Sequence, residues 1–181
     1  MLRFATLAAA AFALAACSSG SEDVDADGDG TVSAEEAQAA SDRVRPMEPG
    51  EYKMAMELVE LQDPSLSEAE IDQARQFFSQ MSNMAPAKCL TEEEANQGMS
   101  GIAEGLQQGD CTTETMTANE DGMNGTMTCK GQNGDARVTI QTTSTGTASE
   151  MTMKVVEPTA DSQEKSTTMK ITMNRVGDCN Q

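Results

Sequence analysis

The sequence predicts a mainly β domain of the α+β class, in which an antiparallel, strongly curved sheet or partial barrel carries one packed amphipathic helix and two disulfides. Three observations favour this class. Beyond residue 110, short segments alternate apolar and polar residues with the period of two that half-buried strands show. Glycine-containing turns separate these segments. Before them, residues 71–84 space their apolar side chains as an amphipathic helix does.

The first sixteen residues, 1–16, are expected to be a lipoprotein signal peptide. Arg3 supplies its positive charge, and its apolar run is shorter than the roughly 20 residues that a membrane-spanning helix needs. The run ends in Leu14-Ala15-Ala16-Cys17, which resembles the bacterial lipobox, where the cysteine is lipidated and becomes the new N-terminus. The alternative is an ordinary cleavage site followed by a chance cysteine.

The lipobox resemblance implies a protein of the cell envelope, held at a membrane through lipidated Cys17. In the Gram-negative pattern, a residue other than Asp after the cysteine favours the outer membrane, facing the periplasm, and Ser18 meets this condition. The following residues, 17–24, are mostly small and acidic. They predict a flexible, lipid-anchored tether.

Residues 25–45 are expected to form an acidic loop and a short helix. The first twelve of them match the EF-hand calcium loop at every ligand position, and Gly30 permits the sharp turn at the sixth. The expected Ca²⁺ ligands are Asp25, Asp27, Asp29, Thr31 through its carbonyl, Ser33 through a water molecule, and Glu36.

The surroundings of this calcium loop differ from those of a complete EF-hand. Residues 18–24 are too few and too polar for a full entering helix, and the sequence contains no second loop. Ser33 and Glu36 also form the capping-box pattern of the helix that follows. We therefore expect weak Ca²⁺ binding, with a Kd of about 0.1–1 mM as in extracellular modules. The alternative is an acidic tether that matches the motif through its composition.

Residues 49–181 are predicted to form one domain. Pro46 and Pro49-Gly50 break the preceding helix and mark the boundary. Residues 52–58 carry apolar side chains at even positions, which predicts the first strand. Asp63-Pro64 ends this strand.

Two helices are expected next. Ser67 and Glu70 form a capping box, and Thr91 to Glu94 form a second one that begins a short helix. In the first helix we expect Phe77 or Phe78 to pack on the sheet. The apolar residues at helical spacing are Ile71, Ala74, Phe77, Phe78, Met81 and Met84.

The remaining strands are separated by turns at Asp121-Gly122, Asn133-Gly134 and Gly146. Their alternation predicts an antiparallel sheet with one buried face and one face in water. The apolar residues that share a face on successive strands are Met127 and Cys129, Val138 and Ile140, Met151, Met153 and Val155, and Met169, Ile171 and Met173.

Five cysteines are present, and lipidation of one leaves four. In an oxidising compartment the default for four cysteines is two disulfides, with three ways to pair them. The sequence favours Cys111–Cys129, across a hairpin that needs a bulge near Cys111, and Cys89–Cys179, which ties the C-terminus back. A zinc or redox site is disfavoured because no C-x-x-C spacing occurs.

Composition excludes several function classes. The net charge is −18, and loss of the signal peptide makes it −19, so the chain repels the phosphate backbone of nucleic acids. It contains no His, which excludes histidine-based acid–base catalysis and histidine metal sites. No pair of acids is singled out by spacing. We therefore expect a non-enzymatic binding or structural module, with a small apolar ligand or an envelope protein as its partner.

Fourteen methionines suggest an alternative function. Met54-x-Met56 and Met151-x-Met153 each place two thioethers on one strand face, and thioethers are soft ligands suited to Cu(I). Cu(I) handling, or scavenging of oxidants by exposed Met, is thus the alternative. Packing in a core poor in aromatic residues is favoured over both, because these methionines coincide with the predicted inward face.

Several short motifs follow one another in the predicted domain: Pro49-Gly50-Glu51-Tyr52, Cys89-Leu90-Thr91-x-Glu93, Gly109-Asp110-Cys111, Gly125-Thr126-Met127-Thr128-Cys129 and Gly177-Asp178-Cys179. Their order resembles that of an exported bacterial family called domain of unknown function 3617. Tyr52 stands where the family more often has Trp, and the calcium loop lies outside the shared region. The resemblance implies an exported protein, a β architecture and a framework of four cysteines. It implies no catalytic residues.

Overall fold

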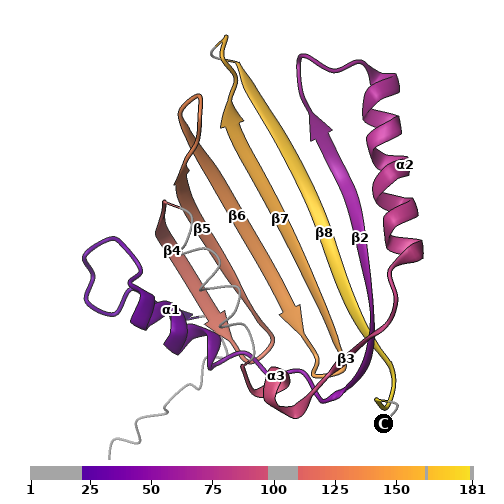
Figure 1. Cartoon of the computed structure of the whole chain (residues 1–181). Helices are drawn as coiled ribbons and strands as arrows, with labels where there is room; N and C mark the ends of the chain where they lie inside the picture. The colour runs from indigo at the N-terminus through magenta and orange to yellow at the C-terminus, as the bar shows by residue number, and fades with distance from the viewer. Residues whose placement is uncertain (1–21, 98–109, 162, 180–181) are drawn as a thin grey trace, which may run out of the picture.

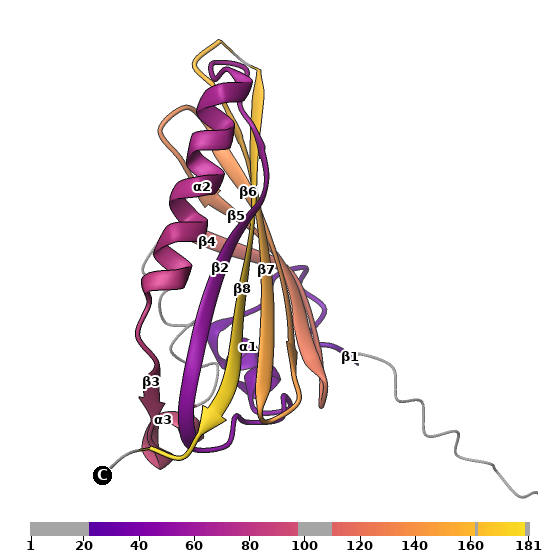
Figure 2. The same ribbon diagram turned by 90° about the vertical axis from the view of Figure 1, so that its right-hand side faces the viewer.

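The computed structural model describes residues 22–97, 110–161 and 163–179. The predicted signal peptide, Cys17 and the tether up to residue 21 lie outside these residues. Within them, eight strands form one antiparallel sheet in the order β1-β4-β5-β6-β7-β8-β2-β3. The sheet is twisted and does not close into a barrel (Figures 1 and 2). The predicted mainly β class, with an antiparallel sheet and two disulfides, is confirmed.

The elements follow the predicted order, with two short strands, β1 and β3, that the sequence does not predict. β1 lies at the end of the predicted tether and pairs with β4. The strands are β1 (Glu22–Asp23), β2 (Gly50–Gln62), β3 (Lys88–Leu90), β4 (Cys111–Asn119), β5 (Gly122–Lys130), β6 (Asp135–Ser144), β7 (Ala148–Pro158) and β8 (Glu164–Gly177), and the helices are α1 (Ala34–Ser41), α2 (Glu68–Met84) and α3 (Glu92–Gln97).

Five consecutive strands, β4 to β8, form a meander of hairpins. The three predicted turns fall between β4 and β5, between β5 and β6, and between β6 and β7. β2 then pairs with β8, so the first long strand lies beside the last (Figure 1). Gly122 illustrates how tightly a turn is packed, because a Cβ atom there would lie 2.0 Å from the carbonyl oxygen of Thr142.

Both favoured disulfides are present. Cys111 lies opposite Cys129 in the β4–β5 pair, and the register shifts between Thr113 and Thr115, where the sequence required a bulge. Cys89 in β3 is bonded to Cys179 beyond β8. The second disulfide therefore joins the edge strand β3 to the C-terminal end of the chain.

The two predicted capping boxes of α2 and α3 are formed. The Ser67 hydroxyl donates to Glu70 Oε2 at 2.7 Å, and the Thr91 amide donates to Glu94 Oε2 at 2.9 Å. These hydrogen bonds stabilise the charged carboxylates. The pKa of Glu70 is lowered, and the pKa of Glu94 falls to about 2 through the Thr91 amide and then the Lys88 ammonium.

Helix α2 packs only loosely against the sheet. Phe77 is 58% exposed and Phe78 is only half-buried, and none of the α2 side chains is buried. β3 covers the outer edge of β2 only at residues 50–52, and α2 lies along the rest of β2 (Figure 1). There the Met56 amide donates to the Ser82 hydroxyl at 2.6 Å. The sequence predicts that Phe77 or Phe78 packs on the sheet. The exposure of Phe77 rules it out, and Phe78 is the more buried of the two.

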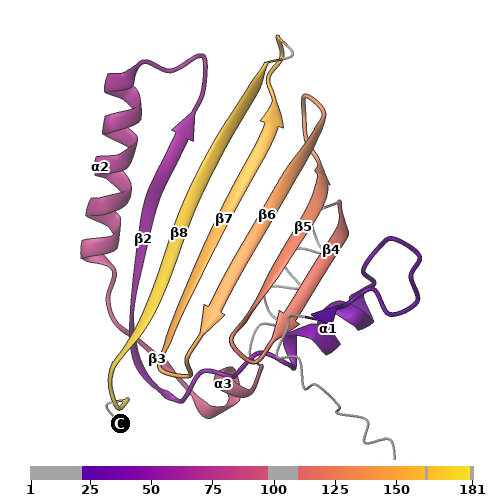
Figure 3. The ribbon, with the colours of Figure 1, turned by 180° about the vertical axis from the view of Figure 1, so that it is seen from behind.

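One face of the sheet is apolar along its whole width, but it is not buried evenly. Over β4, β5 and β6 the apolar side chains are buried, and Met127 is 1% exposed. Over β7, β8 and β2 most of them are only half-buried. On the opposite face, no helix of the described residues lies in front of strands β5 to β8 (Figure 3). The predicted division into a buried and a wet face thus holds fully only in the β4–β6 half.

Candidate functional site

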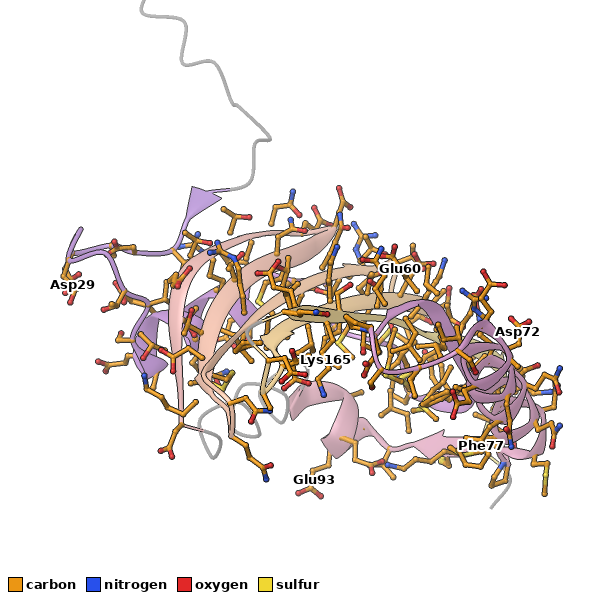
Figure 4. All side chains as sticks on the ribbon, turned by 90° about the horizontal axis from the view of Figure 1, so that it is seen from above. Asp29, Glu60, Asp72, Phe77, Glu93 and Lys165 are labelled. Atoms are coloured by element: carbon orange, nitrogen blue, oxygen red, sulfur yellow. A yellow bond between two sulfur atoms is a disulfide. The ribbon has the colours of Figure 1, made fainter. Side chains whose placement is uncertain are left out.

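The predicted calcium loop projects from the β4 edge of the sheet, and Asp29 lies at its outer end (Figures 1 and 4). Both ends of the loop are bound to β4. The Val24 amide donates to the Met116 carbonyl at 3.0 Å, and the Val32 amide donates to the Thr113 carbonyl at 3.0 Å. Strand β4 thereby fixes the positions at which the loop begins and ends.

The structure brings three of the expected ligands together. Carboxylate oxygens of Asp25, Asp27 and Asp29 all lie within 4.8 Å of one another. Asp25 accepts hydrogen bonds from the amides of Gly28 at 2.8 Å and Gly30 at 3.0 Å, which folds the loop around its carboxylate. Gly30 has a φ of +86°, a backbone conformation that side chains disfavour, so glycine suits this turn.

The next part of the loop is ordered by Asp29 and Asp27. Asp29 Oδ1 accepts from the Thr31 amide at 2.8 Å and from the Thr31 hydroxyl at 2.7 Å. The Asp29 amide donates to Asp27 Oδ1 at 3.2 Å. The bonds between Thr31 and Asp29 use the amide and the hydroxyl of Thr31. They do not use its carbonyl, which is the expected ligand atom.

Glu36 joins the start of the loop to its end. Its Oε1 accepts from the Ala26 amide at 2.7 Å, and its Oε2 accepts from the Ser33 amide at 2.8 Å. The Ser33 hydroxyl in turn caps α1 by accepting from the Glu36 amide. Hydrogen bonds from the Ser33 and Ala26 amides lower the pKa of Glu36, so this carboxylate stays charged. Ser33 and Glu36 therefore serve the helix cap in this conformation and are not grouped with the three aspartates.

The loop and α1 pack on the sheet, whereas the sequence predicts residues 25–45 as a segment separate from the β domain. Their apolar side chains form a buried cluster with β4 and β5 side chains. The signal for this packing in the sequence is the spacing of Ala37 and Ala40 on one helix face, followed by Val44 just beyond the helix. The members are Val24, Val32, Ala37, Ala40, Val44, Met116, Ala118 and Met123.

A pocket of about 350 Å³ lies between the chain that follows α1, the β3–α3 segment and the apolar face of β6, β7 and β8. It is at the end of the sheet that holds the β6–β7 turn (Figure 1). Sequence reasoning did not locate it, because its lining comes from five separate segments. Its apolar lining includes Val44, Met47, Leu90, Ala95, Met151 and Met173.

The strand register places methionines of the Met-x-Met pairs next to other apolar residues on neighbouring strands. Met54 lies opposite Met173, and Met153 lies opposite Met169. Met56 lies opposite Ile171, which in turn lies opposite Met151. These six methionines are half-buried or, at Met54, 38% exposed, unlike the buried methionines of β4 and β5.

No helix within the described residues is long and apolar enough to cross a membrane. Searches of curated proteins and of solved structures found no match to the chain. Comparison with protein families matches residues 47–179 to a family described as protein of unknown function DUF3617. The match includes the four disulfide cysteines and begins after the calcium loop. This chain belongs to the DUF3617 family.

Proposed function

We propose that this protein is a non-enzymatic, lipid-anchored protein of the cell envelope that binds Ca²⁺ through the loop of residues 25–36. The observation that carries the proposal is the grouping of the Asp25, Asp27 and Asp29 carboxylates within 4.8 Å in a loop with EF-hand spacing. Calcium prefers six to eight oxygen ligands, several of them carboxylates. Three like charges held this close repel one another, and a divalent cation relieves the repulsion.

The ligand atoms that the loop offers are oxygens, which are the kind of ligand that calcium binds. Asp25, Asp27 and Asp29 would hold the ion with the Thr31 carbonyl and Glu36, and Ser33 would act through water. Glu36 would give up its bonds to the Ala26 and Ser33 amides on binding, which weakens the net affinity. This cost supports the expected Kd of about 0.1–1 mM, the range of extracellular modules.

The physical role of the ion would be to stabilise the loop and the adjoining edge of the sheet. The Val24 and Val32 amides donate hydrogen bonds to β4, so a loop held in its folded conformation also stabilises the pairing of β4. A ligand that binds only the folded chain also raises its free energy of unfolding. Calcium would thus strengthen the segment between the lipid anchor and the rest of the domain.

Isothermal titration calorimetry on the mature chain without its acyl groups tests calcium binding. We expect one site with a Kd of about 0.1–1 mM, and its loss in Asp25→Asn and Glu36→Gln. Asp161→Asn is the matched control, because Asp161 is an exposed aspartate in the β7–β8 connection. If no heat of binding appears up to several millimolar calcium, or if Asp25→Asn binds calcium as the wild type does, the proposal is contradicted.

The anchor is tested separately. Mass spectrometry of the membrane-extracted protein should show Cys17 as the N-terminal residue with acyl groups attached, and Cys17→Ala should release the protein from membranes. A mature N-terminal peptide without acyl mass would contradict lipid anchoring while leaving calcium binding intact.

Handling of Cu(I), or scavenging of oxidants, is a second candidate. The observation in its favour is that methionines on β2, β7 and β8 are partly exposed, with Met54 opposite Met173. Soft thioethers on neighbouring strands suit Cu(I). Competition with a Cu(I) chelator tests this function: Met54→Leu with Met173→Leu should remove competition, whereas Met81→Leu with Met84→Leu on α2 should retain it. If the wild type does not compete at micromolar concentration, these methionines only pack.

A further inference from the structure

We infer that the pocket between α3, the segment after α1 and the sheet is a binding site for a single-chain aliphatic amphiphile whose polar end is uncharged or positively charged. The inference goes beyond calcium binding and does not rest on it, because the pocket and the loop share no residue.

The lining indicates an aliphatic body. Met47, Met151 and Met173 come from three different segments, and Leu90 and Val44 also line the pocket. Methionine side chains are flexible and polarizable, so they adapt to a ligand that itself bends. A volume of about 350 Å³ is at the lower end of the range for small-molecule sites, which suits one chain better than a multi-ring compound.

Three of the hydroxyl groups that line the pocket are already bound within the protein. The Ser41 hydroxyl donates to the Ala37 carbonyl at 3.0 Å, that of Thr142 donates to the Met123 carbonyl at 3.1 Å, and that of Ser144 donates to the Arg45 carbonyl at 2.9 Å. Their donors are therefore used within the protein. The polar end of a ligand would lie at the mouth of the pocket, where it keeps contact with water.

The charges around the pocket decide the class of that polar end. Three acidic residues line it: Asp42, Glu94, which is paired with Lys88, and Glu150, which is paired with Lys170. Among the described residues that line it, the one cation is Arg45, and its guanidinium is already bound to Glu120 at 2.5 Å. A ligand carboxylate or phosphate would thus lose hydration without gaining an unpaired cation, in the field of a chain with a net charge of −18. An alcohol, amide or ammonium group avoids this penalty.

A series with one chain length and three polar ends tests the inference on the mature chain at neutral pH. Decanol, decylammonium and decanoate, each below its micelle-forming concentration, would displace a neutral environment-sensitive dye from the protein, and native mass spectrometry would count bound molecules. We expect decanol and decylammonium to displace the dye, and decanoate to need at least tenfold higher concentration. Decanoate that binds as well as decylammonium would overturn the ligand class.

Paired variants locate the binding. Met151→Gln with Met173→Gln keeps side-chain length but makes the wall polar, and should weaken decanol binding at least tenfold. Met81→Gln with Met84→Gln on α2 is the matched control and should bind as the wild type does. Both pocket methionines are half-exposed, so folding should tolerate the change, and thermal unfolding checks this. Equal weakening in both pairs, or no displacement by any of the three compounds, would overturn the inference.

Discussion

The amide of Val32, inside the predicted calcium loop, donates a hydrogen bond of 3.0 Å to the carbonyl of Thr113 on β4. Thr113 begins the register shift of β4, so the loop joins the sheet edge at its bulge. The Val32 side chain is buried in the cluster that α1 forms with β4 and β5. The loop is therefore part of the folded domain, and its stability can be measured through the domain.

Replacement of Val32 by Ala should lower the free energy of unfolding by about 1–3 kcal/mol, because it removes two buried methyl groups. Val59→Ala is the matched control. Val59 is 46% exposed on β2, so its truncation should change the free energy of unfolding by no more than about 0.5 kcal/mol. Urea unfolding of both variants measures the difference. Equal effects would mean that the loop does not contribute to the cooperative fold.

The two disulfides should contribute unequally to stability. Cys89–Cys179 spans 90 residues and Cys111–Cys129 spans 18. From loop entropy alone, removal of the first should cost about 4.6 kcal/mol and removal of the second about 3.2 kcal/mol. Paired Cys→Ser variants, unfolded in urea, compare the two. A larger loss from the short loop would show that effects in the folded state outweigh chain entropy.

Acid should weaken the cap of α3. The pKa of Glu94 falls from 4.5 to about 2 because its carboxylate accepts from the Thr91 amide and from Lys88. A lowered pKa means that the folded state binds fewer protons. The contribution of Glu94 is therefore complete above about pH 4.5 and is lost as the pH falls toward about 2.

NMR titration of the Glu94 carboxyl checks this pKa directly. Glu94→Gln should also reduce the stability lost between pH 5 and pH 2, whereas Glu93→Gln on the same helical turn should not. A Glu94 pKa near 4.5 in the folded protein would contradict the capping box as described.

Removal of the Tyr52 hydroxyl should destabilise the junction before β2. Tyr52 is 1% exposed, and its hydroxyl lies 2.8 Å from the Glu48 carbonyl and 3.1 Å from the Gly146 carbonyl. It thus links the start of the domain to the β6–β7 turn. Tyr52→Phe should lower the free energy of unfolding by about 1–2 kcal/mol in urea. An unchanged midpoint would show that water replaces the hydroxyl at both carbonyls.

Local patterns predicted local structure well. Ser67 with Glu70, and Thr91 with Glu94, marked helix starts because capping involves residues three apart. The bulge near Cys111 followed from the phase of alternation in one strand. The favoured pairing of four cysteines was confirmed because a hairpin brings Cys111 and Cys129 together.

Features that depend on distant segments could not be predicted in the same way. Phe77 has the spacing of a buried helix residue, but α2 lies at the edge of β2 and leaves it exposed. The docking of Val32 on Thr113 joins segments about 80 residues apart, and the pocket joins five segments. The three aspartates were found because the calcium-loop motif is contiguous.

Thermal unfolding of the mature protein with and without 10 mM CaCl₂ tests the central claim most directly. With a Kd of about 0.1–1 mM, calcium should add about 1.4–2.7 kcal/mol of stability. For a chain of this size, that raises Tm by about 3–10 °C. The wild type should show this rise, while Asp25→Asn should not, and MgCl₂ at the same concentration controls for ionic strength. A Tm that calcium leaves unchanged, or raises equally in Asp25→Asn, would contradict calcium binding by the loop.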